Sequence, residues 1–272
     1  MSLITETWHK LSSAKHFYPM AGVLLPWLLI PALLMLAWAS WQGLVVAPSD
    51  YQQGDSYRII YVHVPSAWLS MMAYMVMAIN GAVYLIWKIK LADIVAAAAA
   101  PIGASFTFLA LATGSLWGKP MWGAWWVWDA RLTSELVLLF LYLGTIALRA
   151  AIDDRQQAGR AAGLLGLIGV INVPIIHFSV EWWETLHQPA TVSKFAAPSM
   201  HPSMLVPLLV MAAGFTLYFF AVLLIKIRAG ILEQERHSRW LATLYADGEA
   251  SGARLTPAQP PAKQNNEEAR DE

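Results

Sequence analysis

The sequence predicts an all-α integral membrane protein with six transmembrane helices and an outward-facing, tryptophan-rich loop. Three observations lead to this fold class. Of the 272 residues, 57% are hydrophobic and only 13% are charged. Apolar runs long enough to cross a bilayer as a helix, which takes about 20 residues, recur along the chain. Five tryptophans fall within twelve residues between two of these runs.

Six stretches have the length of a membrane span. Four contain no Asp, Glu, Lys, Arg or His and lie between Phe17 and Val46, between Val64 and Trp87, between Ile94 and Gly118, and between Pro202 and Ile225. The fourth span is predicted between Leu132 and Leu148 and carries Glu135, and the fifth, between Ala161 and Val180, carries His177. We expect His177 to face the bundle interior, as ionisable side chains in spans usually do. The first span is too long and too interrupted by proline for a signal-peptide core, so we expect it to stay in the protein.

The positions of Lys and Arg predict the orientation, because cytoplasmic loops carry the excess of basic residues. With six spans, 11 basic residues fall on one side: Lys10, Lys15, Lys88, Lys90, Arg149, Arg155, Arg160, Lys226, Arg228, Arg236 and Arg239. The other side receives 4: Arg58, Lys119, Arg131 and Lys194. Both termini are therefore expected in the cytoplasm. We interpret 1–245 as the membrane domain with its cytoplasmic N-terminal segment, and 246–272, rich in Pro, Gly, Asn and charge, as a disordered cytoplasmic tail.

The composition excludes several classes of function. The 18 basic residues are balanced by 18 acidic residues, so membrane lipid is an expected partner and nucleic acid is not. The absence of cysteine excludes disulfides, thiolate metal sites, iron–sulfur clusters and covalent attachment of a c-type haem to this chain. The sequence contains no phosphate-binding loop. The chemistry must therefore come from histidines, carboxylates and aromatic side chains.

The end of the third predicted span and the stretch that follows it hold the five clustered tryptophans: Trp117, Trp122, Trp125, Trp126 and Trp128. One or two tryptophans at the end of a span are ordinary at a membrane interface. Five of them, interspersed with glycine and proline that disfavour a plain helix, predict a rigid aromatic shelf at the water boundary. Such a surface suits a large, flat, mostly apolar ligand.

Two histidines fall on the same outer side as this shelf. His63 opens the second predicted span, and His187 follows the fifth. Each has a proline two residues later, so we expect each at a defined break rather than within a regular helix. Either histidine alone is compatible with an interfacial hydrogen-bonding role. The pair, with the aromatic shelf between them in sequence, favours a bis-imidazole haem site.

A haem site also needs positive charge or dipoles for the propionates. Arg58, Lys119 and Arg131 are the candidates on the outer side. Asp129 is interpreted either as the N-cap of the fourth span or as a functional residue, and the two roles are compatible. Capping would place the positive end of that helix beside the site. Arg131 and Glu135 are four residues apart and could pair on one helix face.

The run from Trp117 to Leu132, WGKPMWGAWWVWDARL, resembles the tryptophan-rich WWD signature of membrane proteins that handle haem. It lies between the third and fourth of six predicted spans, with one histidine before the second span and one between the fifth and sixth. This arrangement is similar to the cytochrome c maturation protein C family, also called haem exporter protein C. The resemblance covers about residues 20–226.

The resemblance implies that His63 and His187 are the axial ligands of haem b and that the five tryptophans and Asp129 form a periplasmic signature. It implies a haem-transfer component of the bacterial inner membrane rather than an enzyme. Members of the family deliver haem to a membrane-anchored chaperone, maturation protein E. They act alongside an ATP-binding-cassette ATPase (maturation protein A), a membrane component (maturation protein B) and a small component (maturation protein D), so ATP hydrolysis would belong to a partner.

Three other functions remain open. A membrane b-type cytochrome that exchanges electrons with quinone would hold its haem at membrane depth, where His177 is the candidate ligand. A non-haem metal site would use Glu184 and His187 as a Glu-x-x-His pair, of which the sequence has a single copy. An ordinary permease would use the tryptophans only as part of an interfacial belt.

Overall fold

The computed structural model describes residues 12–187, 200–244 and 246, and in these ranges the regular secondary structure is helical. Six helical segments in the described part are long and apolar enough to span a membrane: Ala14–Val46, Asp55–Trp87, Lys90–Trp122, Ala130–Ala151, Arg155–Trp182 and Pro202–Glu235. The predicted all-α membrane fold is confirmed. The chain forms two compact units, Met1–Glu233 and Gln234–Glu272. Apart from residue 246, the predicted tail at 246–272 lies outside the described residues.

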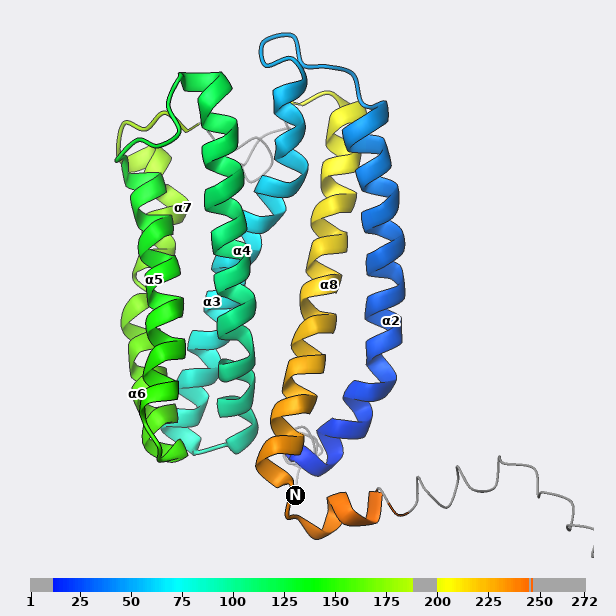
Figure 1. Ribbon diagram of the computed structural model, residues 1–272, viewed down its shortest axis with the longest axis vertical. Helices are drawn as coiled ribbons and strands as arrows, with labels where there is room; N and C mark the ends of the chain where they lie inside the picture. The colour runs from blue at the N-terminus through cyan, green and yellow to red at the C-terminus, as the bar shows by residue number, and fades with distance from the viewer. Residues whose placement is uncertain (1–11, 188–199, 245, 247–272) are drawn as a thin grey trace, which may run out of the picture. The chain divides into compact units, whose positions relative to one another are not determined.

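The first unit is a bundle of long helices (Figure 1). In chain order its helices are α2 (Ala14–Trp41), α3 (Ile60–Trp87), α4 (Lys90–Trp122), α5 (Ala130–Ala151), α6 (Arg155–Gly169), α7 (Asn172–Trp182) and α8 (Pro202–Glu235). A π-helical turn at Gln42–Val46 and a 3₁₀ helix at Asp55–Ile59 join α2 to α3.

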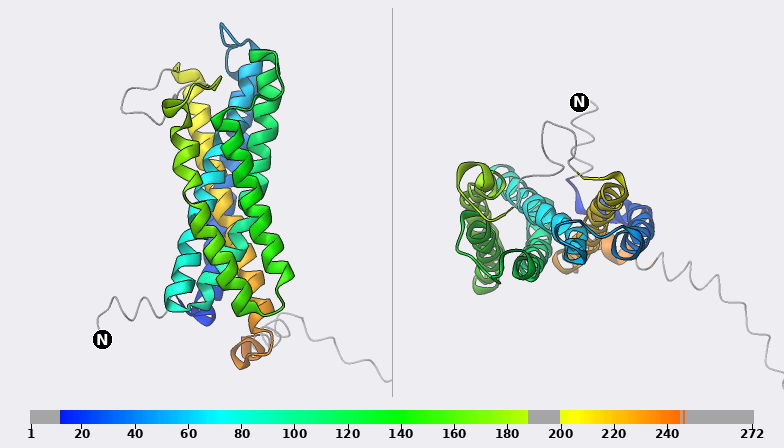
Figure 2. Two further views of the ribbon diagram at one scale, coloured as in Figure 1. Left: turned by 90° about the vertical axis from the view of Figure 1, so that its left-hand side faces the viewer. Right: turned by 90° about the horizontal axis from the view of Figure 1, so that it is seen from above.

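Within this unit, α3 to α7 form one packed group, and α2 and α8 run side by side next to it (Figures 1 and 2). Leu36 of α2 packs on Gly214 of α8, where an added Cβ would lie 3.1 Å from the leucine side chain. Phe106 of α4 contacts Phe215 and Phe219 of α8, with ring centres 6.0 and 6.5 Å apart. Aromatic rings of α4 and α8 therefore join the two groups, and a glycine on α8 lets α2 pack closely against it.

The fifth span differs from the prediction of one continuous helix, because it is divided into α6 and α7. Pro174 has no N–H, so the carbonyl of Val170 loses the donor that a regular helix would supply four residues later. Val173 donates to that carbonyl instead, at 3.0 Å. Proline is the usual cause of such a break in a long helix.

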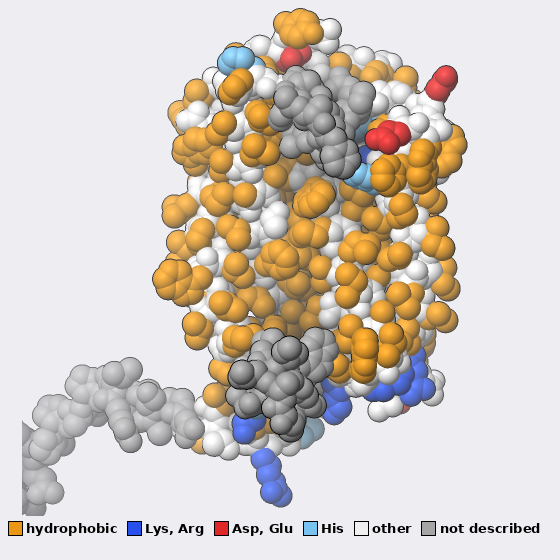
Figure 3. All heavy atoms as spheres, turned by 180° about the vertical axis from the view of Figure 1, so that it is seen from behind, with side chains coloured by type: hydrophobic (Ala, Val, Ile, Leu, Met, Phe, Trp, Pro, Cys, Tyr) orange, Lys and Arg blue, Asp and Glu red, His pale blue; other side chains and the backbone are white. Residues whose placement is uncertain are grey.

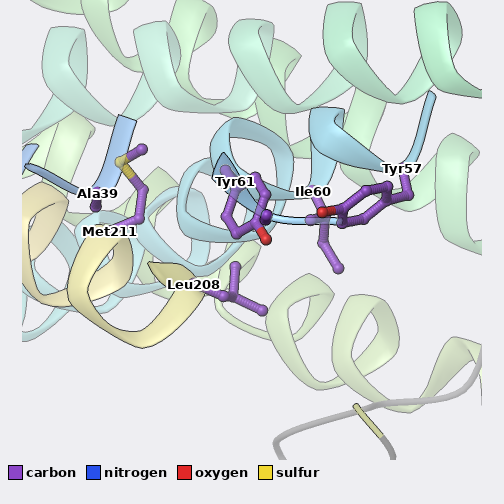
Figure 4. Packing of buried hydrophobic residues seen from close by; sticks show 7 residues of the cluster. Ala39, Tyr57, Ile60, Tyr61, Leu208 and Met211 are labelled. Atoms are coloured by element: carbon purple, nitrogen blue, oxygen red, sulfur yellow. The ribbon is translucent and has the colours of Figure 1, made fainter. Parts of the chain in front are cut away.

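A buried apolar cluster joins α2, α3 and α8 near the start of α3 (Figure 4). It consists of Ala39, Ala47, Tyr57, Ile60, Tyr61, Leu208 and Met211. The Tyr61 hydroxyl donates to the carbonyl of Met204 on α8, at 3.2 Å. At Gly43 an added Cβ would lie 2.8 Å from the Tyr61 ring. These contacts fix the first turn of α3, and His63 lies in that turn.

The two ends of the bundle differ in charge. Figure 3 shows Lys and Arg side chains gathered at one end, here called the basic end. Arg149 of α5 binds Asp93 of α4 there through two hydrogen bonds of 2.8 and 3.0 Å. The opposite end holds His63 and is here called the histidine end. The orientation of these two ends relative to the cytoplasm remains a prediction from the basic residues.

Candidate functional site

His63 is the fourth residue of α3, and the helix continues past it without interruption. The predicted break at this histidine is therefore wrong. Pro65 has no N–H, so the carbonyl of Tyr61 lacks the donor that a regular helix would supply. The loss of this one hydrogen bond near the start of the helix does not interrupt it. The Ser66 hydroxyl donates to the carbonyl of Val62 at 2.7 Å in the same turn. His63 is consequently carried on a rigid helix rather than on a loop.

The His63 ring is oriented by α4. Its Nδ1 lies 3.0 Å from the carbonyl oxygen of Ala110 and 3.1 Å from the hydroxyl of Thr113. A carbonyl oxygen only accepts, so the ring proton is assigned to Nδ1, and the lone pair of Nε2 is left to bind a metal. Metal-binding histidines usually donate their second ring N–H to a carbonyl or carboxylate in this way.

His187 lies beside His63, although 124 residues separate them in the sequence. It follows the end of α7 at Trp182 and is not in a helix. The centres of the two imidazole rings are 6.2 Å apart, and the ring planes are inclined by 36°. Two imidazoles that bind one metal ion from opposite sides, with each nitrogen about 2 Å from the metal, have ring centres about 6 Å apart. The spacing of this pair fits such a site.

Two residues of α4 complete the surroundings of His63. The Trp117 ring meets it edge to face, with centres 5.7 Å apart, and the Trp117 indole N–H donates to the side chain of Gln53 at 3.0 Å. At Gly114 an added Cβ would lie only 3.1 Å from Cε1 of His63. The glycine thus lets the imidazole approach α4, and the tryptophan supplies an apolar wall next to it.

The prediction that glycine and proline keep the tryptophan stretch out of a plain helix is partly wrong. Helix α4 extends to Trp122 and contains Pro120, whose missing N–H affects only the last turns. The helix ends at Gly123, which has a left-handed φ of 77° and donates its N–H to the carbonyl of Lys119 at 3.0 Å. Glycine adopts this conformation without steric cost.

The later tryptophans lie around the rim of the histidine end. The carbonyl of Trp125 accepts from the Ser115 hydroxyl at 2.7 Å, which folds the loop back on α4. Trp126 and Trp128 meet edge to face, with ring centres 5.4 Å apart. Trp128 is 76% exposed. The buried Nε1 of Trp126 has no hydrogen-bond partner in the described part of the chain, so this indole is available to an acceptor on a ligand.

Asp129 is the N-cap of α5, and this prediction is confirmed. Its carboxylate accepts from the backbone N–H of Leu132 at 2.8 Å. The predicted pair between Arg131 and Glu135 is absent from the ion pairs of the described residues. Arg131 donates to the carbonyl of Ile176 on α7 at 2.6 Å instead. Because Arg131 lies within electrostatic range of His63, it remains a cation available to a negatively charged ligand.

Arg58 has a different environment from Arg131. Its guanidinium donates to the carbonyls of Gly43 and Ala47 at 2.9 and 2.8 Å, and to the carboxylate of Asp55 at 3.1 Å. These bonds join the end of α2 to the segment that leads into α3. The contacts of Arg58 therefore support the connection between these helices.

Comparison with known proteins agrees with this arrangement. The sequence profile of the family described as "Heme exporter protein C" matches residues 7–242. The chain belongs to the heme exporter protein C family. "Heme exporter protein C" of Escherichia coli strain K12 is 53% identical over 239 residues, which cover 88% of this chain and 96% of the relative. The protein of the same name from Bradyrhizobium diazoefficiens is 51% identical over 228 residues, covering 84% and 86%.

A more distant relative comes from a plant. The "Putative cytochrome c biosynthesis ccmC-like mitochondrial protein" of Arabidopsis thaliana is 43% identical over 200 residues, which cover 74% of this chain and 75% of the relative. Membership of the heme exporter protein C family and the six apolar helices identify the chain as a multi-pass membrane protein.

One prediction tied to the alternative functions is wrong for this member of the heme exporter protein C family. His177 does not face the bundle interior but is exposed, with its ring against Phe178, because Ile176 and Ser179 occupy the buried positions of α7. Glu184 and His187 follow the end of α7, so no helix brings them to one face. Among the described residues there is no cluster of three or more His, Asp or Glu placed to hold a metal ion.

Sequence reasoning missed three residues of the heme exporter protein C chain that orient His63. Ala110, Thr113 and Gly114 lie in a predicted apolar span, and only the structure shows that they contact the imidazole. The spacing of Thr113 and Trp117 could have indicated this contact. The two residues are four positions apart, so they lie on the same face of any helix that continues as far as Trp117.

Proposed function

We propose that this member of the heme exporter protein C family binds haem b through axial bonds from His63 and His187 and transfers it to a periplasmic haem chaperone. The observation that carries the proposal is the pair of imidazoles. Their ring centres are 6.2 Å apart, and His63 directs its N–H away from the pair toward Ala110. Two neutral imidazoles supply the axial nitrogen donors of a low-spin haem.

The other residues have distinct roles in this proposal. Trp117, which touches His63, provides apolar contact for the macrocycle. Arg131 and the N-terminus of α5, capped by Asp129, supply the positive charge and dipole that stabilise the propionates. The buried Nε1 of Trp126 can donate to the same groups. Trp122, Trp125 and Trp128 are exposed and are suited to contact both the haem edge and an approaching partner.

The difference between the two histidines supports transfer rather than permanent storage. His63 is fixed on a helix by two hydrogen bonds from its ring to α4. His187 is on a non-helical segment. A ligand on such a segment can leave the iron with less rearrangement of packed structure than one on a helix. We therefore assign His63 to holding the haem and His187 to its release.

We further propose that the chain lies in the bacterial inner membrane with both termini in the cytoplasm, so that the histidine end faces the periplasm. The support is the 11 to 4 distribution of basic residues. Reporter fusions after Ser49 and Lys119 should be periplasmic, and fusions after Lys90 and Asp154 cytoplasmic. A cytoplasmic reporter at Lys119 would contradict the orientation and the route of transfer.

The expected partners are a haem chaperone of the maturation protein E type, an ATP-binding-cassette ATPase (maturation protein A), a membrane component (maturation protein B) and a small component (maturation protein D). The relatives' names, which refer to haem export and cytochrome c biosynthesis, support a role in such an assembly. ATP hydrolysis is assigned to the partner ATPase, because this chain contains no phosphate-binding loop.

Transfer is tested by measuring, in the same cells, the Soret absorbance of this protein and the haem attached to the coexpressed chaperone. Replacing Trp122, Trp125 or Trp126 by alanine should lower both quantities, because each fully covered ring would lose roughly 150–250 Å² of contact. The control is Trp27→Ala, since Trp27 is 75% exposed and lies near the middle of α2, roughly 20 Å from the end of that helix at 1.5 Å per residue. Full haem loading and full transfer in the three loop variants would show that these rings only anchor the protein in the membrane.

A further inference from the structure

Glu135 is a buried carboxyl group inside the helical bundle. It is 6% exposed and lies one turn beyond Arg131 on α5. Its Oε1 has no hydrogen-bond partner in the part of the chain that the structure describes. An ionisable side chain within a membrane span is expensive to bury, and such residues are usually functional. The fold does not use this carboxyl group in an ion pair among the described residues.

The hydroxyl groups near Glu135 are committed to other acceptors. The Ser70 hydroxyl, which neighbours the carboxyl group of Glu135, donates to the carbonyl of Ala67 at 2.8 Å. The Tyr142 hydroxyl donates to the carbonyl of Ser70 at 2.7 Å. The Tyr142 proton is therefore directed at a backbone carbonyl, and Oε1 of Glu135 has no donor among the described residues.

The charged neighbours of Glu135 connect it to the histidine pair. Arg131 lies one helical turn before Glu135 on α5, at the end of that helix that is next to the histidines. Tyr142 on the same helix is the other ionisable group that interacts with Glu135. No Asp, Glu, Lys, Arg or His of α4, α6 or α7 acts on it within the described ranges. Tyr142 of α5 is hydrogen-bonded to Ser70 of α3, and Glu135 and His63 each lie seven residues earlier on these two helices. Glu135 therefore lies at a depth in the bundle similar to that of His63.

We propose that Glu135 is a positioning residue of the haem site, which sets the charge behind Arg131 and thereby the reduction potential of the iron that His63 binds. This inference rests on the proposed function, because it concerns the haem held by His63 and His187. Glu135 does not touch the haem in this account. It acts through Arg131 and through the electric field in the bundle.

The sign of the effect follows from electrostatics. Oxidation of the iron adds one positive charge at the site, and a nearby negative charge stabilises the oxidised form. In the low-dielectric interior of a bundle this interaction extends much further than it does in water. An ionised Glu135 therefore lowers the reduction potential, and its protonation raises it. Since the charge of Glu135 changes with pH, the potential also becomes dependent on pH.

The test is spectroelectrochemical titration of the purified, haem-loaded protein in detergent at several pH values. Glu135→Gln replaces the carboxyl group by a neutral polar side chain, and Glu135→Leu replaces it by an apolar one. Two neutral variants are used so that at least one keeps a folded bundle. Both should raise the potential and reduce its dependence on pH. Glu135→Asp retains the carboxyl group and should restore most of the wild-type behaviour. Tyr142→Phe, which removes a neighbouring hydroxyl group but no charge, should leave the potential unchanged.

The outcomes separate this inference from the proposed function. Low-spin haem in both wild type and Glu135→Gln, with equal potentials and equal pH dependence, overturns the role of Glu135 and leaves the histidine site intact. A wild-type protein without low-spin haem overturns the proposed function and this inference with it. A downward shift in the neutral variants contradicts the proposed sign.

Discussion

The two ends of the bundle use their polar residues in different ways. At the basic end, the Asp93 carboxylate and the Arg149 guanidinium bind each other through two hydrogen bonds, and the Asp93 side chain is only 9% exposed. At the histidine end, the buried Nε1 of Trp126 and Oε1 of Glu135 have no partner in the described residues. Arg131 donates to a single carbonyl there.

Under the proposed function, this difference separates an end that stabilises the fold from an end that binds a ligand. Buried polar groups in proteins are normally hydrogen-bonded, and an unpaired one calls for a specific explanation. The histidine end also holds two imidazoles with ring centres 6.2 Å apart. A haem with its propionates would supply acceptors for the free donors. The basic end is already satisfied by its own side chains.

The largest effect on ligand binding is expected from the histidines. His63→Ala and His187→Ala should each abolish or strongly reduce haem retention, because losing either imidazole leaves one axial position of the iron open. The double variant should be little worse than either single one, since both residues serve one iron. Soret absorbance per protein after purification measures the effect.

Two other histidines provide matched controls. His177 and His201 are exposed, and the His201 ring contacts Ser203 at the start of α8, at 2.8 Å. His177→Ala and His201→Ala should keep the wild-type haem content. If either control loses as much haem as His63→Ala, the assignment of the two axial ligands is wrong.

The largest effect on stability is expected at the basic end. Asp93→Ala leaves the Arg149 guanidinium buried without its partner, and breaking a buried pair in this way costs about 3–5 kcal/mol. The folded fraction should still show a wild-type haem spectrum, because the pair is at the opposite end of α4 from Thr113. Thermal unfolding and the Soret spectrum check the two statements. An unchanged unfolding midpoint would remove the distinction between the two ends.

A smaller effect is expected from Thr113→Val. The threonine hydroxyl, 3.1 Å from Nδ1 of His63, is one of two acceptors for the ring proton, and the carbonyl of Ala110 remains in the variant. Loss of a group that orients a metal ligand reduces affinity by roughly 10–100-fold. With one acceptor left, we expect about tenfold weaker haem binding, at the low end of that range. A titration of the apoprotein with haem measures it, and unaltered affinity would show that Ala110 alone orients the ring.

The smallest effect is expected from Trp128→Ala. Because Trp128 is 76% exposed, its removal should change the free energy of unfolding by less than about 0.5 kcal/mol. Haem retention should also be nearly unchanged. Trp117→Ala, at a ring that touches His63, should lower haem retention clearly. Equal losses in the two variants would indicate that the tryptophans act as one surface rather than as an inner wall and an outer rim.

The sequence was sufficient for the six spans and for the grouping of the two histidines with the tryptophans. Uncharged runs of bilayer length leave few alternatives to a spanning helix. The N-cap at Asp129 was also predictable, because a short acceptor side chain preceded an apolar run. These features depend on local composition and spacing.

The incorrect predictions concern tertiary structure. Pro65 and Pro120 indicated breaks, but both lie near helix ends where one lost hydrogen bond is tolerated. Pro174 did break the fifth span, because its position lies inside a long helix. The contact of His63 with Ala110 and Thr113 depends on how α3 packs on α4, and no single-sequence pattern encodes that register.

The central claim, that His63 and His187 bind one haem iron, is tested most directly by imidazole rescue. Ferric His63→Gly and His187→Gly, measured with haem added in excess because their retention is weak, should each lack the low-spin absorption and electron paramagnetic resonance spectra of the wild type. Added imidazole should restore both spectra in each variant by filling the open axial position. If either variant keeps the low-spin bis-imidazole spectra without added imidazole, the substituted histidine is not an axial ligand, and the account of the site is contradicted.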